Sequence, residues 1–270
     1  YGGLNKFDRQ SEKFIHYKHS DDDSTSLSDN SVSVIYRDRK GVLWIGTRFG
    51  GLNELDFRTE KFRLHNINSE QVKNVNPNKI ISILEDSSGI LWIGTQELGL
   101  IKLNKETGQF KNYMMKDGLP GDYILGILED NTGNLWLSNN PGLSKFNPLA
   151  EKFRNYDIED GLQSNEFEEY PACYKSKTGE LIFGGINGFN IFYPDSIKDN
   201  SHIPPIYITD FYLFNEPVRV GYDSLSDRTI LNTSIIDCEE IELNFDDKVF
   251  SFEFAALDFH SPNKNKYAYI

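Results

Sequence analysis

Apolar residues in this chain are grouped in short runs that return at nearly constant spacing. The clearest run is Leu43-Trp44-Ile45-Gly46-Thr47, which returns unchanged at 91–95 and with substitutions at 135–139. A weaker copy occupies 181–184, where Ile182 stands in place of the tryptophan. The aligned positions are 44, 92, 136 and 182, so the steps are 48, 44 and 46 residues. Runs of this length and period indicate a repeat built from β-strands.

Each repeat contains four strand-like patterns separated by glycine turns. The first is an apolar run that ends in acidic residues, as in 83–86, and a glycine follows three residues after the aspartate. The second is the tryptophan run, which is apolar on both faces and predicts a strand covered on both sides. In the third, apolar and polar residues alternate more clearly, as in 100–103. The fourth begins with an aromatic residue, as in 62–65. Because no 3.6-residue apolar period occurs within a repeat, this order predicts the four-stranded antiparallel blades of a β-propeller.

A different pattern begins after residue 200. The segment Ser201-His202-Ile203-Pro204-Pro205 indicates a linker, because prolines interrupt strand pairing and stiffen a connection. Strand patterns follow at 206–213, 240–243 and 250–254. In the last of these, phenylalanines alternate with Ser251 and Glu253, which predicts a half-buried strand of a sandwich. We therefore expect two domains, with propeller repeats in 1–200 and a sandwich in 201–270.

The repeated phrase Gly-x-Leu-Trp-Ile-Gly-Thr, followed by Gly-Gly-Leu, resembles the two-component regulator propeller repeat. The segment 252–259, with Tyr267-Ala268-Tyr269 near the end, looks like the triple-tyrosine domain. The resemblance implies an all-β chain: a partial β-propeller of about four and a half four-stranded blades, followed by the start of an Ig-like β-sandwich. This order resembles the extracytoplasmic sensor region of Bacteroides-type hybrid two-component receptors.

Composition narrows the classes of partner. The chain has 270 residues and a formal net charge of −13, which argues against binding a nucleic-acid backbone or an anionic membrane surface. It contains no run of about 18 apolar residues that would predict a transmembrane helix. Cys173 aligns with Ile83 and is expected to be a buried apolar residue, and a disulfide with Cys238 remains open. Residues 1–8 match 49–56, the middle of a repeat, and the roughly 65 residues after the linker are too few for a complete sandwich, so we expect both ends of the chain to be cut within a fold.

Several groups could carry chemistry, but each has a structural interpretation. The recurring tryptophans indicate core packing and the aspartates before them indicate turn formation; they are Trp44, Trp92, Trp136, Asp38, Asp86 and Asp130. His16 and His19 lie near Asp21-Asp22-Asp23 without the second ligand pair that a zinc site needs, so we expect a solvated loop. The adjacent pairs 168–169 and 239–240 would point to opposite faces of a strand and could not form a facing acid and base. We therefore expect no catalytic residue, no metal and no cofactor.

The loops after the tryptophan strands differ from blade to blade, although the strands and glycine turns that frame them repeat. They hold the candidate ligand-binding residues Arg48, Phe49, Gln96, Glu97, Asn139, Asn140 and Asn187. Amide and guanidinium groups bond hydroxyls, and an aromatic ring covers an apolar ring face, so this set suits an oligosaccharide. The alternative is that these are ordinary surface loops with unconstrained sequences.

The resemblance implies a periplasmic, ligand-sensing region without enzymatic activity of its own. It would bind an oligosaccharide and pass the signal through the sandwich to a kinase elsewhere in a membrane receptor, with homodimerisation through the full receptor. One alternative is a propeller-fold polysaccharide or antibiotic lyase, which needs a His, Glu or Tyr base; among the loops only Glu97 stands out. Another is a passive protein-interaction platform.

Overall fold

The computed structural model describes residues 2–65, 67, 79–168, 172–198, 204–223, 228–257 and 267. The chain divides into two compact units, Tyr1–Lys198 and Asp199–Ile270, which are described separately. The regular structure of the described residues consists of β-strands and four short 3-10 helices. No helix in these ranges has the length and apolar character needed to cross a bilayer.

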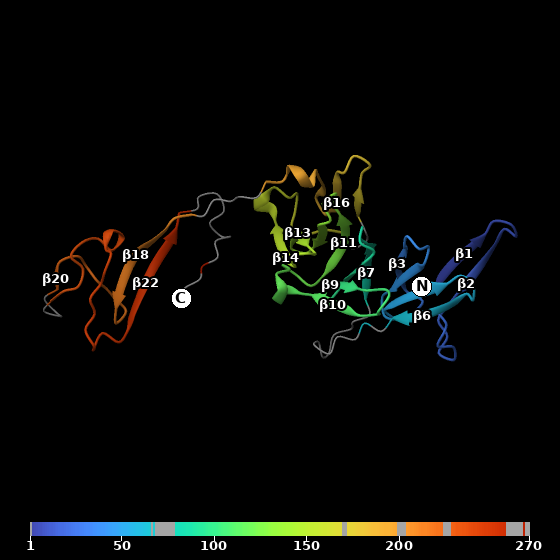
Figure 1. Cartoon of the computed structure of the whole chain (residues 1–270), viewed down its shortest axis with the longest axis horizontal. Helices are drawn as coiled ribbons and strands as arrows, with labels where there is room; N and C mark the ends of the chain where they lie inside the picture. Colours follow the sequence, from blue (N-terminus) through green and yellow to red (C-terminus); the bar gives the residue numbers. More distant parts are fainter. Residues whose placement is uncertain are drawn as a thin grey trace. The chain divides into compact units, whose positions relative to one another are not determined.

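The first unit is a series of antiparallel sheets that follow one another in chain order (Figure 1). It begins with a two-stranded sheet of β1 (Leu4–Asp8) and β2 (Lys13–Tyr17). Three four-stranded sheets follow, and in each the strands pair in chain order, which confirms the blade prediction for these repeats. Their strands are β3 Val32–Arg37, β4 Leu43–Thr47, β5 Leu52–Asp56 and β6 Lys61–His65; β7 Ile80–Glu85, β8 Leu91–Thr95, β9 Leu100–Leu103 and β10 Phe110–Tyr113; β11 Ile124–Glu129, β12 Leu135–Asn139, β13 Gly142–Asn147 and β14 Lys152–Tyr156.

The next sheet departs from the prediction of four strands in every blade. In the described residues it contains three, β15 (Cys173–Lys175), β16 (Leu181–Gly185) and β17 (Gly188–Phe192). After β17 the chain turns into the 3-10 helix η3 (Pro194–Ser196). Pro194 has no N–H to donate to a strand ladder, so a fourth strand is disfavoured at this point. Among the described residues this sheet therefore has one strand fewer than predicted.

The first strands of successive sheets lie side by side and form the inner edge of the unit. Strand β7 contacts both β3 and β11, and β11 contacts β15. The pairing register of β3, β7 and β11 shifts at the second residue of each strand. Such a bulge bends the strand and increases its twist. Adjacent inner strands with the remaining strands further out are the arrangement of propeller blades.

The recurring tryptophans form the core between these sheets, as predicted. Trp44, Trp92 and Trp136 are 2 %, 0 % and 1 % exposed. Trp92 of β8 packs in one cluster with Ile127 and residues of β12 and β13 in the following sheet. Its ring centroid lies 5.6 Å from that of Phe146 in a T-shaped contact. One sheet thus contributes its tryptophan to the apolar surface that the next sheet covers.

The second unit contains the sheet β19-β18-β22 and the short pair β20–β21. Its elements are β18 Ile206–Leu213, β19 Glu216–Pro217, β20 Tyr222–Asp223, β21 Arg228–Thr229, η4 Ile235–Asp237 and β22 Phe250–Ala256.

Two of the three strands expected in the second unit are confirmed, but residues 240–243 are not a strand, so that prediction is wrong. Two apolar residues alternating with two acids are too short a pattern to identify a strand. The side chains of Phe250, Phe252 and Phe254 are 40–52 % exposed. Residues 201–203, 258–259 and 268–269, which belong to the expected linker and triple-tyrosine motif, lie outside the described ranges.

Candidate functional site

Two kinds of loop gather at one end of the blade sheets, here called the loop end. The hairpin loops join the second and third strands of each sheet, at 47–51, 95–99, 139–142 and 185–188. The inter-sheet segments lead from one sheet to the first strand of the next, at 18–31, 114–123 and 157–168. Because neighbouring strands are antiparallel, both kinds of loop occur at the same edge. They are joined there: Arg48 N donates to Ser31 O (2.9 Å), and Gln96 N donates to Lys79 O (3.2 Å).

Four of the predicted ligand-binding residues lie in the first two hairpin loops. The Phe49 side chain is 60 % exposed. Glu97 is also exposed, whereas Arg48 and Gln96 are partly exposed. The backbone bonds of Arg48 and Gln96 fix the points from which their side chains start. The structure therefore brings an aromatic ring, a guanidinium, an amide and a carboxylate to the same end of two neighbouring sheets.

The three predicted asparagines have different environments. Asn139 is completely buried, and its Nδ2 donates to Ser144 Oγ (2.9 Å), so it supports its loop instead of facing solvent. Asn140 is exposed, and its Oδ1 accepts from Phe167 N (2.8 Å) in the next inter-sheet segment. Asn187 is exposed, and its backbone N donates to Gln163 Oε1 (3.1 Å). The last two therefore lie where the hairpin loops meet the inter-sheet segments.

The inter-sheet segments contain a repeated hydrogen bond that the sequence analysis missed. Side-chain oxygens of Asn30, Asp122 and Asn165 accept from the backbone N of His19 (2.9 Å), Met115 (2.7 Å) and Ile158 (2.9 Å), respectively. The second and third of these segments also contain equivalent 3-10 helices, η1 (Met115–Asp117) and η2 (Ile158–Asp160). The signal for these loops was the recurrence of Asp-Gly-Leu at 117–119 and 160–162.

The opposite end of the sheets, here called the turn end, is held by the repeated aspartates. Their Oδ1 atoms accept from turn N–H groups at Val42 (2.8 Å), Ile90 (3.0 Å) and Asn134 (2.9 Å), which confirms the turn prediction. Their Oδ2 atoms accept from the indole Nε1 of the tryptophan in the same sheet, at 3.1, 2.7 and 3.0 Å. Asp38, Asp86 and Asp130 therefore join each turn to the core.

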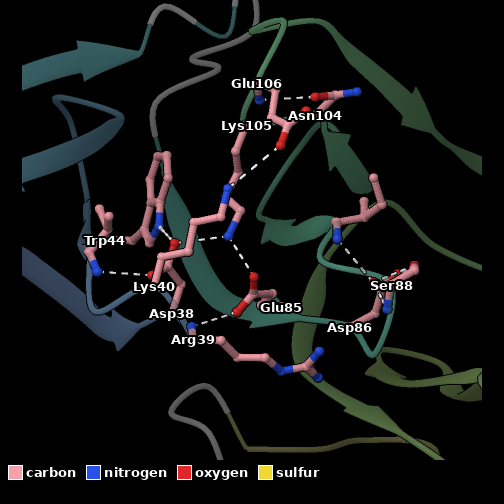
Figure 2. A network of polar contacts seen from close by, with 12 residues as sticks. Asp38, Arg39, Lys40, Trp44, Glu85, Asp86, Ser88, Asn104, Lys105 and Glu106 are labelled. Atoms are coloured by element: carbon pink, nitrogen blue, oxygen red, sulfur yellow. Dashed lines mark hydrogen bonds and ion pairs between the residues drawn. The ribbon is translucent and has the colours of Figure 1, made fainter.

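A buried ion-pair network fastens the first two complete sheets together at the turn end. Lys105 Nζ lies 2.8 Å from Asp38 Oδ2 and 2.6 Å from Glu85 Oε1, and Figure 2 shows the amine between the two carboxylates. The three side chains are 12 %, 1 % and 4 % exposed. The other oxygen of Glu85, Oε2, accepts from Arg39 N (2.7 Å) in the preceding sheet. At the next junction Glu129 accepts equivalently from Ser87 N (2.9 Å).

These contacts decide the charge states of the network. Burial disfavours the Asp38 carboxylate, but hydrogen bonds from Lys105, Trp44 and Val42 N outweigh it and lower the pKa of Asp38. Burial likewise disfavours the Lys105 ammonium, but its bonds to Asp38 and Glu85 raise the pKa of Lys105. At Asp130 burial is outweighed by bonds from Thr132, Trp136 and Asn134, and the pKa of Asp130 is lowered. Asp38 and Lys105 are therefore both charged around neutral pH.

His19 and the two cysteines are further side chains with reactive groups. His19 Nδ1 bonds Leu27 O (2.8 Å), and this contact together with Asp21 raises the pKa of His19. Among the described residues no cluster of three or more His, Cys, Asp or Glu side chains could hold a metal ion. Cys173 and Cys238 are free thiols. Cys173 packs against the cluster that contains Phe183, and burial raises the pKa of its thiol to about 11.

Comparison with protein families identifies the repeats. Residues 26–49, 74–97 and 118–140 match the family model described as Two component regulator propeller. The first and third matches begin in an inter-sheet segment and end in a hairpin loop, so they include the strands that carry the Asp–Trp bond. The chain therefore contains two component regulator propeller repeats.

Comparison with individual proteins extends the similarity to both units. The extracellular domain of a hybrid two component system from Bacteroides thetaiotaomicron is 30 % identical, with a TM-score of 0.69 over 97 % of this chain and 34 % of that chain. The extracellular domain of a one component system from the same organism shares the fold, with 23 % identity and a TM-score of 0.58 over 94 % of this chain and 44 % of that chain.

A curated relative, Histidine kinase P4 of Formosa agariphila, is 33 % identical over 153 residues, which are 57 % of this chain and 11 % of that protein. This chain thus spans about a tenth of the curated relative and less than half of either solved domain.

Proposed function

We propose that this chain is part of the extracytoplasmic sensor region of a hybrid two-component receptor. The observation that carries the proposal is its similarity, over 97 % of its residues, to the extracellular domain of such a system. The propeller repeats support the same assignment. On this proposal the chain lies in the periplasm, and the kinase activity belongs to other parts of the receptor.

The proposed ligand is an oligosaccharide that binds at the loop end. Two features support this location: the strands repeat from sheet to sheet while the hairpin loops differ, and the differing residues other than Asn139 are exposed or partly exposed. Phe49 offers a ring face, while Arg48, Gln96 and Asn140 offer groups that bond hydroxyls. Ligand binding would act on the receptor by favouring one arrangement of its homodimer over another.

The experiment is calorimetric titration of the chain with oligosaccharides derived from xylan, mannan, cellulose and arabinan. Arg48→Ala and Gln96→Ala should lower the affinity for a bound oligosaccharide about tenfold each without changing the melting temperature. Matched controls at the turn end are Arg58→Ala and Gln109→Ala, which remove the same residue types from exposed positions. They should leave the affinity unchanged.

Two outcomes would contradict the proposal. Equal losses of affinity in the loop-end and turn-end variants would place the ligand elsewhere. Turnover of an oligosaccharide during the titration would favour an enzyme instead of a sensor.

A further inference from the structure

The residue that ends the second strand of each blade sheet has a constant role in the first two complete sheets. Thr47 and Thr95 are 0 % and 1 % exposed. Their Oγ1 atoms donate to the carbonyls of Gly51 (3.0 Å) and Gly99 (2.9 Å). The same oxygens accept from loop N–H groups, at Gly50 (3.0 Å) and Leu98 (2.9 Å). A buried hydroxyl thus fixes the backbone of each of these hairpin loops.

In the three-stranded sheet the equivalent residue is Gly185, which has no side chain to perform this role. The space is filled instead by Gln163, which comes from the preceding inter-sheet segment. A Cβ atom placed on Gly185 would lie 2.1 Å from Gln163 Nε2 and 2.6 Å from Glu166 O. Gln163 Oε1 accepts from Asn187 N (3.1 Å), which is the bond that the threonine oxygens accept in the other loops.

Gln163 is itself fixed from both sides. Its backbone N donates to Asn190 Oδ1 (3.0 Å) on β17. A few residues further on, Phe167 N donates to Asn140 Oδ1 (2.8 Å) in the hairpin loop of the preceding sheet. Segment 163–167 therefore bonds to hairpin loops of two neighbouring sheets, and each bond involves a residue, Asn140 or Asn187, that is a candidate ligand contact.

We propose that Gln163 is a positioning residue for the ligand-binding face, holding the 185–188 loop so that the Asn187 side chain is presented to an oligosaccharide. The inference rests on the proposed function for its ligand and on the hydrogen-bond geometry for its mechanism. It makes the placement of Asn187 dependent on a side chain of an inter-sheet segment, whereas in the first two loops the equivalent acceptor is a threonine of the same sheet. Gln163 contacts no ligand in this mechanism.

The first arm of the test needs no ligand. Hydrogen–deuterium exchange of the peptide covering 185–190 is compared in wild type, Gln163→Met and Gln163→Glu. Methionine keeps the volume but removes the acceptor, so the Asn187 amide should exchange about tenfold faster, as expected for one lost hydrogen bond. Glutamate keeps an oxygen at Oε1 and should retain protection. Gln109→Met, at an exposed turn-end position, is the matched control and should change nothing.

The second arm measures affinity for whichever oligosaccharide binds the wild type. Gln163→Met should weaken binding about as much as Asn187→Ala, Gln163→Glu should restore it, and the double variant should be no weaker than Asn187→Ala alone. Unchanged exchange in Gln163→Met, or further weakening in the double variant, would overturn the inference. If no oligosaccharide binds the wild type, the proposed function fails, while the exchange arm still decides whether Gln163 holds the loop.

Discussion

Replacing Lys105 by methionine tests whether the buried network of Figure 2 holds the first two complete sheets together. The substitution keeps most of the aliphatic volume and removes the ammonium group that pairs with two carboxylates. Those carboxylates belong to side chains that are 1 % and 4 % exposed, so water cannot replace the lost ammonium easily.

The magnitude follows from the burial. Removing one partner of a buried ion pair costs about 3–5 kcal/mol, because it leaves an uncompensated charge. Since 12 % of the Lys105 side chain still reaches solvent, we expect a loss at the lower end, about 3 kcal/mol at pH 7. This loss of stability should shrink in acid, because protonation of Asp38 then removes its unpaired charge.

Urea unfolding followed by tryptophan fluorescence is the appropriate assay, because Trp44, Trp92 and Trp136 all lie in the first unit and Trp44 bonds Asp38 directly. Lys111→Met is the matched control: Lys111 also lies 2.6 Å from a carboxylate, on Glu151, but both side chains are about half exposed. Lys111→Met should lower the free energy of unfolding much less than Lys105→Met does. Equal losses in the two variants would refute the reasoning. Replacing Glu85 by glutamine together with Lys105→Met should recover part of the stability, because one buried charge is removed and the remaining amide oxygen can still accept from Arg39 N.

Three further predictions follow from the core and its acids. Trp92→Ala should lower the free energy of unfolding by about 3–5 kcal/mol, and a near-normal melting temperature would show that the core assignment is wrong. Folding lowers the pKa values of Asp38 and Asp130 below their unfolded value, near 3.8. Their contribution to stability is therefore present above the unfolded pKa and is lost as pH falls through the folded values. The free energy of unfolding of Asp130→Asn should accordingly depend less on pH in this acid range than that of the wild type. The Cys173 thiol, with a pKa of about 11, should react with an aromatic disulfide reagent at pH 8 about a hundredfold more slowly in the native chain than in urea, measured in a Cys238→Ser background.

The features that repeat could be predicted from the sequence. Trp44, Trp92 and Trp136 were assigned to the core, and the aspartates before them to turns, because identical residues at equivalent strand positions meet identical surroundings. The Asp–Trp hydrogen bond was missed, although it also repeats. Its partners are six residues apart, the aspartate at the start of the turn and the tryptophan on the following strand, and only the hairpin register brings the indole Nε1 to the carboxylate.

The features that occur once could not be predicted in the same way. Lys105 is 67 residues from Asp38, and the equivalent turn positions hold Phe57 and Pro148, so no recurrence marks it. Gln163 replaces a side chain that Gly185 lacks, which becomes visible only when the two segments are placed together in space. The predicted ligand residues lie in the hairpin loops or, for Asn139, at the end of the strand that leads into one. Burial separates Asn139 from the others because it ends strand β12 instead of entering the loop.

The glutamates at the ends of β7 and β11 have a consequence for how such a chain could have grown. Glu85 and Glu129 each bond a backbone N–H of the sheet before, so any sheet that supplies the same turn can receive the same carboxylate. A gene duplication that copies one repeat therefore copies both the glutamate and the turn N–H that it bonds. Blades that are held together only by this contact are interchangeable. Lys105 adds a contact at a single junction, but its partner in the preceding sheet is the aspartate that recurs as Asp86 and Asp130. The sheet β7–β10 could therefore follow any sheet that carries this aspartate and keep the same ion pair.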